Sequence, residues 1–440
     1  MRVDRRGFRS AAFALVAVLA VSGCRSEQGS SPSDAPQLET ASAQAPTGGR
    51  NAAQWLDAPY VVLVSLDGFA SRYMQQYGPP TLTELAERGV WAPQGMVPVY
   101  PTKTFPSHYS IATGLHPARH GLVGNTIYDP ARDETYRISD REKVEDGTWY
   151  GGEPLWVTAE SQGMVAASFF WVGSEADVGG VRPSYWRTFD ADITNSQRVD
   201  GVLEWLGYPP ERRPHMLTLY FEETDNVGHE FGPDSPEIGE AVTAVDGELR
   251  RLLDGISALE HGDQVTVIVV SDHGMDGYLP ETTEYVADAL GDLEGIRFTE
   301  VGPNGTMWVD GGPERAREVR DAINAGLEHV TAYVPDETPE ELHYRGNPRL
   351  GDVLLVPDSG WVVYPENDRP ARAGFTHGWD SRNLSMRSVF VAAGPGIEPG
   401  SQVDPFSSVD VYPLVTELLG LRPASEIDGT LDTWEPVLQR

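Results

Sequence analysis

Three aspartates and three histidines stand beside apolar segments of this 440-residue chain. They are Asp67, Asp225, His229, Asp272, His273 and His377. Each says little alone, since a lone histidine is commonly a surface or satisfied core residue and Asp-Gly is commonly a turn. Together they could converge, because the carboxyl ends of parallel strands meet at one edge of a sheet, where ligands bind. Nitrogen and oxygen ligands without a cysteine suit zinc, and manganese or iron less well.

The spacing and number of these residues fit a pair of ions. Asp225 and His229 are four residues apart, so both point the same way on a helical turn and can reach one ion. Six protein ligands, with the Thr104 alkoxide as a seventh, are about what two four-coordinate ions need with room left for a substrate. Two metal ions about 4 Å apart can activate an attacking oxygen and bind phosphoryl oxygens across both.

The segment Tyr100-Pro-Thr-Lys-Thr-Phe-Pro-Ser-His-Tyr109 contains two hydroxyls, Thr102 and Thr104, between two prolines that restrict the backbone. Taken alone, a Pro-rich connection whose threonines bond the local backbone is the more common interpretation. Beside two metal ions, Thr104 instead becomes a nucleophile for phosphorus, because a metal contact supplies the acidity that a hydroxyl lacks. Asn125 and the Thr104 backbone N–H would stabilise the extra charge.

The apolar pattern predicts an α/β protein with a mostly parallel sheet, because strands alternate with helices. The predicted strands are 60–65, 165–171, 216–221, 264–270 and a last one at 388–393. The predicted helices are 81–89 (with Thr81 as its N-cap), 108–113, 199–206, 237–259 and 409–419. Residues of about 278–373 predict a smaller α+β insertion with strands at 296–301, 306–309, 353–356 and 361–364 around a helix at 313–327.

The N-terminus predicts export and a lipid anchor. Residues 1–23 contain a twin-arginine pair and an apolar stretch too short to span a bilayer, which is typical of a signal peptide. Cys24, the only cysteine, ends a sequence typical of a bacterial lipobox, so we expect cleavage before it and lipidation of its sulfur. The Ser-, Ala- and Pro-rich residues 24–50 predict a disordered tether, and residues 51–440 the catalytic domain.

The composition excludes stable binding to nucleic acid, because a formal charge of −33 repels DNA and RNA. A phosphate compound could bind only where local cations overcome that field, and metal ions would do so. Lysine occurs only at positions 103 and 143, among many arginines. The oligomeric state is not indicated by the sequence.

From residue 60 to 434 the chain resembles the nucleotide pyrophosphatase/phosphodiesterases of the alkaline phosphatase superfamily. The matching segments are SLDG at 65–68, PTKTFPSHYS at 101–110, HGLVGN at 120–125, GGEPLW at 151–156, FFW at 169–171, EETDNVGHEFGP at 222–233, SDHGM at 271–275 and THGWD at 376–380. The resemblance implies an alkaline-phosphatase-like core carrying the insertion. The chain differs from the family at Ser107, where the family usually has asparagine.

The resemblance implies two Zn²⁺ per chain and a phospho-threonine intermediate on Thr104 that water then hydrolyses. It also gives Asn125 a contact with the phosphate. One zinc ion would be bound by Asp225, His229 and His377. The other would be bound by Asp67, Thr104, Asp272 and His273.

The resemblance also implies a nucleotide substrate, such as ATP or a dinucleotide, cleaved to a nucleoside 5′-monophosphate. Phe105 and Phe189 would stack on the base, with Lys143 beside them and Trp171 and Glu175 also lining the pocket. The segment 173–187 is intact, whereas the lysophospholipase D type lacks it and opens a lipid pocket there.

Three other functions remain open. The first is a lysophospholipid or glycerophosphodiester phosphodiesterase on the same core, for which Phe105 and Phe189 would be unimportant. The second is a phosphomonoesterase, which needs little beyond the phosphate site. The third is a non-catalytic lipoprotein that binds zinc or nucleotides and has no use for an aligned hydroxyl.

Overall fold

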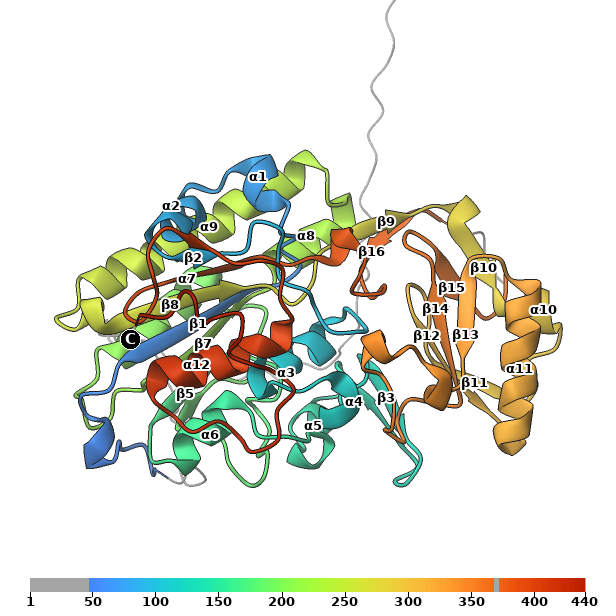
Figure 1. Ribbon diagram of the computed structural model, residues 1–440, viewed down its shortest axis with the longest axis horizontal. Helices are drawn as coiled ribbons and strands as arrows, with labels where there is room; N and C mark the ends of the chain where they lie inside the picture. Colours follow the sequence, from blue (N-terminus) through green and yellow to red (C-terminus); the bar gives the residue numbers. More distant parts are fainter. Residues whose placement is uncertain (1–46, 368–371, 440) are drawn as a thin grey trace, which may run out of the picture. The chain divides into compact units, whose positions relative to one another are not determined.

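The computed structural model describes residues 47–367 and 372–439. The predicted signal peptide of residues 1–23, the lipidation site Cys24 and most of the predicted tether lie outside the described residues. Among the described residues, none of the helices is both long and apolar enough to cross a bilayer. The described part consists of one large sheet with helices on both faces and a smaller sheet formed by the predicted insertion (Figure 1).

The large sheet has eight strands in the order β18-β2-β17-β8-β1-β7-β5-β6. Its neighbours pair in parallel except at β17, which runs antiparallel to both β8 and β2. The mostly parallel sheet predicted from the sequence is therefore confirmed. The strands are β1 (Tyr60–Leu66), β2 (Val90–Trp91), β5 (Ala166–Phe169), β6 (Tyr185–Trp186), β7 (Met216–Phe221), β8 (Val265–Val270), β17 (Phe390–Ala393) and β18 (Ser401–Gln402).

Strand β1 lies at the centre and is buried along its whole length. Val61 and Leu63 belong to the hydrophobic cluster on one face of the sheet, and Val62 and Val64 to the cluster on the other. One cluster includes side chains from α3 (Thr104–Thr113), α6 (Leu155–Ser161) and α12 (Val411–Leu419). The other includes side chains from α1 (Tyr73–Tyr77), α2 (Pro80–Arg88), α7 (Asn195–Leu206) and α9 (Pro236–Ser257) (Figure 1).

The start of α2 differs from the prediction that Thr81 caps it. The helix begins at Pro80, and the backbone N–H groups of Thr81 and Leu82 donate to the two carboxylate oxygens of Asp246 at 3.0 and 2.9 Å. Asp246 is a buried residue of α9. The cap is therefore tertiary, and no local pattern in the sequence could reveal it.

Two further boundaries differ from the predictions, and both shape the site. The helix expected from residue 108 begins four residues earlier, at Thr104, which becomes the first residue of α3. The strand expected to reach Trp171 ends at Phe169, because Phe170 adopts a left-handed backbone with φ 64°. This conformation is uncommon for a bulky residue. Strand β17 is also not the last strand, since β18 follows it.

The insertion has its own sheet in the order β11-β12-β14-β13, with α11 packed on one face through a separate apolar cluster. Its elements are α10 (Val286–Leu290), β11 (Ile296–Glu300), β12 (Gly305–Val309), α11 (Gly312–Gly326), β13 (Val330–Tyr333) and β14 (Val353–Pro357). Strand β10 (Thr283–Tyr285) pairs with β15 (Val362–Tyr364). Strands β9 (Asp276–Tyr278) and β16 (Gly374–Thr376) pair where the chain leaves and re-enters the core (Figure 1).

Four shorter elements complete the surroundings of the site. They are α4 (Pro117–His120), the hairpin of β3 (Thr126–Asp129) and β4 (Glu134–Arg137), α5 (Arg141–Val144) and α8 (Glu223–Phe231). Helix α8 follows β7 directly and carries Asp225 and His229, so these two residues share the helical turn expected from their spacing.

Candidate metal centre and substrate pocket

The predicted ligands converge at the carboxyl edge of the large sheet. Asp67 follows β1, and Asp272 and His273 follow β8, while Asp225 and His229 lie on α8 after β7. Ligand atoms of Asp225, His273 and His377 lie within 4.8 Å of one another. Those of Asp67, Asp272 and His108 do so as well.

These two groups differ from the ligand sets that the resemblance implies. His273 groups with Asp225 and His377, and its ring stacks on that of His377 at 3.5 Å between centroids. However, its Nε2 also lies 2.9 Å from Asp272 Oδ2 and 3.6 Å from Asp67 Oδ1. His229 stands at the margin of the first group, with Nε2 3.5 Å from Asp225 Oδ1. The two sets therefore adjoin one another, and His273 lies between them.

His108 is the histidine that the sequence analysis missed. It is fully buried, and both ring nitrogens are engaged, Nδ1 with the Thr104 carbonyl at 2.9 Å and Nε2 with the Ser65 hydroxyl at 2.8 Å. Its Nδ1 also lies 3.3 Å from Asp272 Oδ2, and we assign the ring a supporting role because both nitrogens already have hydrogen-bond partners. The signal was present in the sequence: His108 stands four residues after Thr104, one helical turn away.

The other three histidines share one arrangement. Each Nδ1 faces a backbone carbonyl, which for His273 is Gly274 at 3.0 Å, for His377 Thr102 at 2.8 Å and for His229 Phe375 at 2.9 Å. A contact of this kind fixes the ring and its tautomer, leaving Nε2 as the free ligand atom. In all three cases Nε2 lies close to a carboxylate of the cluster.

Two buried carboxylate oxygens in this cluster, Asp67 Oδ1 and Asp225 Oδ1, have no hydrogen-bond partner, and a third, Asp272 Oδ2, faces only ring nitrogens, His273 Nε2 at 2.9 Å and His108 Nδ1 at 3.3 Å. The second oxygen of Asp67 accepts from the Tyr220 hydroxyl at 2.6 Å, and that of Asp272 from the Gly68 amide at 3.1 Å. A buried, unsatisfied charged oxygen is costly unless an ion compensates it. The three oxygens and three Nε2 atoms are thus a donor set that fits zinc.

The electrostatics of these acids point the same way. Burial raises the pKa of Asp67 well above its usual value, and the charges of Asp272 and Asp225 raise it further. Burial also raises the pKa of Asp225. The pKa of Asp272 is held well below its usual value because His273 and His108 outweigh the opposing effect of burial. A cation would relieve the repulsion among these three carboxylates.

Thr104 is the hydroxyl next to the cluster. Its Oγ1 lies 3.4 Å from His273 Nε2. Asn125 adjoins the same helix start, where its Oδ1 accepts from the Phe105 amide at 3.2 Å. Because its amide oxygen is occupied, Asn125 can offer its Nδ2 hydrogens to a ligand. Thr102, the other threonine of the loop, instead bonds the backbone of Gly378 and Trp379, at 3.0 and 2.9 Å.

A cavity of about 370 Å³ opens directly from this cluster. Asp67, Thr104 and Asp225 line it together with aromatic side chains. Trp171 is held by a hydrogen bond from its Nε1 to the His108 carbonyl, and Phe189 is 39% exposed at the rim. The predicted pocket residues in this lining are Phe105, Trp171, Glu175 and Phe189.

Lys143 differs from its predicted place in the pocket. It is not part of the cavity lining, and its ammonium pairs with Glu134 at 2.6 Å. Arg141, two residues earlier on α5, lines the cavity instead and pairs with Glu175. The two side chains leave helix α5 on different sides. The sequence pattern did not establish which of them would face the cavity.

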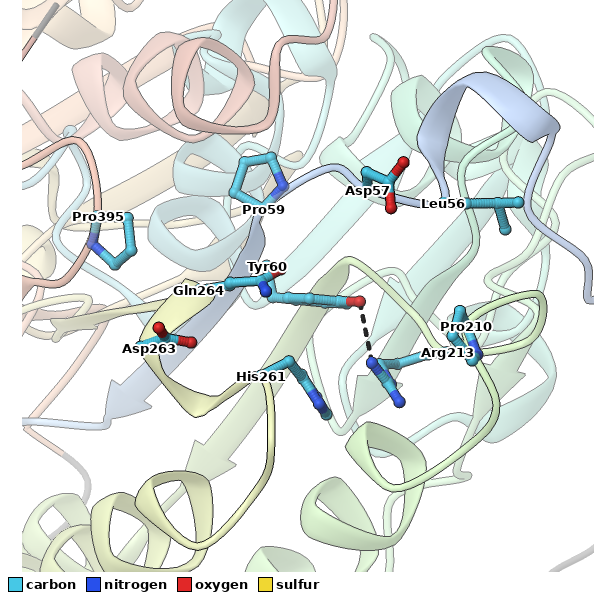
Figure 2. A pocket seen from close by; sticks show the side chains of 10 residues that line it. All are labelled: Leu56, Asp57, Pro59, Tyr60, Pro210, Arg213, His261, Asp263, Gln264 and Pro395. Atoms are coloured by element: carbon cyan, nitrogen blue, oxygen red, sulfur yellow. Dashed lines mark hydrogen bonds between the residues drawn. The ribbon is translucent and has the colours of Figure 1, made fainter.

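A second cavity, of about 590 Å³, lies at the opposite edge of the sheet (Figure 2). Tyr60 opens β1 there, and its hydroxyl accepts from Arg213 at 3.1 Å. His261 and Asp263 also line it. Within residues 47–367 and 372–439, neither of the two clusters that could hold a metal ion includes a residue of this cavity.

The fold and the site define the class of the protein. It is an α/β protein with a candidate metal-binding cluster of aspartates and histidines beside an aromatic cavity, at the carboxyl edge of its sheet. The family model of type I phosphodiesterase/nucleotide pyrophosphatase matches residues 61–380, and the chain therefore belongs to that family. This confirms the resemblance noted from the sequence motifs.

Individual relatives agree with this assignment. Human ectonucleotide pyrophosphatase/phosphodiesterase family member 1 is 35% identical over 379 residues, covering 84% of this chain and 40% of the human protein. Venom phosphodiesterase CdcPDE of Crotalus durissus collilineatus is 35% identical over 84% of this chain and 45% of its own length. The chain thus spans less than half the length of these curated relatives.

Solved structures agree as well. Murine ectonucleotide pyrophosphatase/phosphodiesterase 5 superimposes with a TM-score of 0.81 at 27% identity, covering 86% of this chain and all of the murine one. An inactive Thr-to-Ala variant of the same murine protein has been solved in complex with AMP, with a TM-score of 0.81. The predicted fold is therefore confirmed.

Proposed function

We propose that this protein is a di-zinc phosphodiesterase that hydrolyses nucleotides and nucleotide diesters to nucleoside 5′-monophosphates. The observation that carries the proposal is the single cavity that joins the cluster of unsatisfied carboxylates, the Thr104 hydroxyl and the aromatic rings of Phe105 and Phe189. A phosphate at the cluster would have its nucleoside within reach of those rings. Family membership and the murine AMP complex support a nucleotide substrate.

Asp67, Asp225, Asp272 and the Nε2 atoms of His229, His273 and His377 would hold the two zinc ions, together with Thr104 Oγ1. Zinc would supply positive charge for the phosphoryl oxygens and lower the pKa of the threonine hydroxyl. The inactivity of the Thr-to-Ala murine variant supports a chemical role for a threonine in this fold.

In the first step, Thr104 Oγ1 attacks the α-phosphorus, the Oγ1–P bond forms, and the bond from phosphorus to the leaving oxygen breaks. Asn125 Nδ2 would donate to an equatorial phosphoryl oxygen, where negative charge grows. In the second step, water attacks the phosphorus of the phospho-threonine, the P–Oγ1 bond breaks, Thr104 Oγ1 regains a proton, and the nucleoside 5′-monophosphate is released. Because the Asn125 amide oxygen accepts from the Phe105 N–H at 3.2 Å, nucleophile loop and donor keep a fixed relation.

The experiment that tests this function compares two p-nitrophenyl esters on the zinc-loaded chain from residue 51. We expect kcat/KM for the thymidine 5′-monophosphate ester to exceed that for phosphorylcholine by at least about tenfold, since stacking on a base contributes about 1–3 kcal/mol. Preference for the choline ester would instead favour a lipid headgroup site on the same centre. Binding without turnover of either ester would favour the non-catalytic alternative.

We also propose that the protein is exported and anchored at the bacterial cell envelope through lipidated Cys24, because the twin-arginine pair and the lipobox stand in the expected order. Replacing Cys24→Ala in the full chain should move the protein from the membrane fraction to the soluble fraction. Retention of the variant on membranes at the wild-type level would contradict a lipid anchor.

A further inference from the structure

One of the two lysines of the chain forms a buried ion pair beside the nucleophile. Lys103 directly precedes Thr104, and its Nζ lies 2.8 Å from Glu300 Oε2. Glu300 is the last residue of β11 in the insertion. The two side chains are only 12% and 9% exposed, so solvent screens this pair far less than a surface pair. The insertion thus contacts the nucleophile loop through a well-defined polar link.

The second oxygen of the same carboxylate contacts the other catalytic segment. Glu300 Oε1 accepts from the Thr126 amide at 2.7 Å, and Thr126 directly follows Asn125. Asn125 in turn accepts from the Phe105 amide at 3.2 Å, and Phe105 follows Thr104. The contacts therefore close a ring that runs from the nucleophile loop through Glu300 to the Asn125 turn and back.

Two glycines leave room for this ion pair. A Cβ at Gly124 would lie 2.9 Å from Glu300 Oε1, and a Cβ at Gly378 would lie 2.9 Å from Lys103 Cε. Gly124 precedes Asn125, and Gly378 follows His377. The pair is thus packed against the backbone of two segments that carry site residues, and Lys103 belongs to a third, so a shift of either partner would disturb the packing of the site.

We propose that Glu300 is a positioning residue that holds Thr104 and Asn125 at their working separation, through Lys103 on one side and the Thr126 amide on the other. The proposal rests on the proposed function and gives the insertion a part in it. Glu300 lies outside the cavity lining and outside both ligand groups. Its effect would therefore be on geometry, where a misplacement of about 1 Å can cost about 100-fold in rate.

The first test compares Glu300→Gln with Glu337→Gln, a matched change within the insertion at a carboxylate that pairs with Arg320. Glu300→Gln removes the charge that holds Lys103 while keeping an oxygen for Thr126. We expect kcat for the nucleotide ester to fall by at least about tenfold with KM changed less than about threefold, since only alignment of the reacting groups is lost. Zinc content and Tm should stay near wild type, and Glu337→Gln should leave kcat unchanged.

The second test is a double-mutant cycle with Lys103→Met. If the two residues act as one unit, the double variant should lose no more kcat than the worse single variant. Lys103→Arg, which keeps the charge, should retain more activity than Lys103→Met. Losses that multiply independently, or a wild-type kcat in Glu300→Gln, would overturn the proposal.

Hydrogen exchange separates this proposal from the proposed function, because it needs no turnover. The Thr126 amide should exchange faster in Glu300→Ala than in the wild type, since its acceptor is gone. Unchanged exchange would refute the positioning role even if the enzyme is active. A wild-type chain that turns over no phosphodiester would refute the proposed function whatever the exchange shows. Unfolding of both Glu300→Gln and Lys103→Met would assign the pair to stability and overturn the proposal.

Discussion

The large sheet has a cavity at each edge: one at the amino ends of its parallel strands and one at their carboxyl ends. The two edges differ in the charge of the ionisable groups buried there. Strand β1 spans both, beginning at Tyr60 and leading to Asp67. At its start, Tyr60 stacks on His215 at 4.4 Å between ring centroids. Its hydroxyl also accepts a hydrogen bond from Arg213 (Figure 2). At its end, Asp67 is buried with one oxygen unsatisfied. Because both edges have a cavity, a cavity alone does not identify the functional site.

The difference between the edges lies in whether the buried ionisable groups can become neutral. Burial lowers the pKa of His215 to about 4, so the residue is neutral at pH 7 and needs no counter-charge. At the other edge, neutrality is not available to every acid, because the pKa of Asp272 is held well below its usual value while that of Asp67 is raised. A cation would therefore relieve the charges at the carboxyl edge, whereas at the amino edge burial keeps His215 uncharged, although the Nε2 atoms of His215 and His261 have no hydrogen-bond partner there.

Of the substitutions that test this difference between the edges, Thr104→Ala should lower turnover most. The change removes the attacking oxygen and leaves the carboxylates and histidines in place, so we expect kcat to fall at least about 1,000-fold. Zinc content and Tm should remain near wild type. Thr243→Ala, on the exposed face of α9, is the matched control. Substantial turnover by a metal-replete Thr104→Ala would refute the nucleophile assignment.

The next largest effect should come from His377→Ala, which removes an Nε2 close to Asp225 at 3.7 Å. We expect lower zinc content by elemental analysis and at least about tenfold lower kcat/KM, partly restored by added zinc, because losing a ligand weakens metal binding. His329→Ala is the control, since that histidine pairs with Asp358 in the insertion. Full zinc content in His377→Ala would remove this residue from the ligand set.

Much of the carboxyl edge could be predicted from the sequence, for a physical reason. The apolar runs of β1, β7 and β8 mark strands buried on both faces, and the acid that follows each one must lie at the same edge. Asp67, Asp225 and Asp272 were found in this way. The spacing of Asp225 and His229 was sufficient to place both on one face of a helix.

The features that could not be predicted from the sequence depend on contacts between segments far apart in the chain. The cap of α2 by Asp246 joins residues 165 apart, and the pairing of Lys103 with Glu300 joins residues 197 apart. Neither has a local pattern. Lys143 was misplaced because the short helix α5 decides by its register which side chain enters the cavity, and Arg141 has that position. Local periodicity does not determine such a register over one turn.

A smaller effect, confined to substrate choice, should follow from Phe189→Ala. The ring is 39% exposed at the cavity rim and packs edge-on against Phe170 at 5.1 Å, so its removal should leave the centre intact. We expect kcat/KM for the nucleotide ester to fall about tenfold, the usual effect of losing one stacking face. The choline ester should be unaffected. Phe231→Ala, a phenylalanine 44% exposed on α8, should change neither ester. Equal losses for both esters would argue against a base clamp.

The smallest effect on turnover, and the one that characterises the other edge, should come from His215→Phe. The folded pKa of about 4 lies below the unfolded value of 6.5, so the unfolded chain binds one more proton between these two pH values. The stability that neutral His215 contributes is complete above pH 6.5 and is lost as the pH falls through 4. Phenylalanine can stack on Tyr60 and cannot be protonated.

We therefore expect the unfolding free energy of His215→Phe to depend less on pH, by on the order of 1 kcal/mol per pH unit between pH 6.5 and 4.5. Urea unfolding of both proteins at matched zinc would measure this, and kcat at pH 8 should be unchanged because the residue lies at the edge away from Thr104. Parallel pH profiles would mean that His215 is not buried as the neutral form. A large loss of kcat with normal stability would mean that the amino edge takes part in function, and the contrast between the two edges would then be wrong.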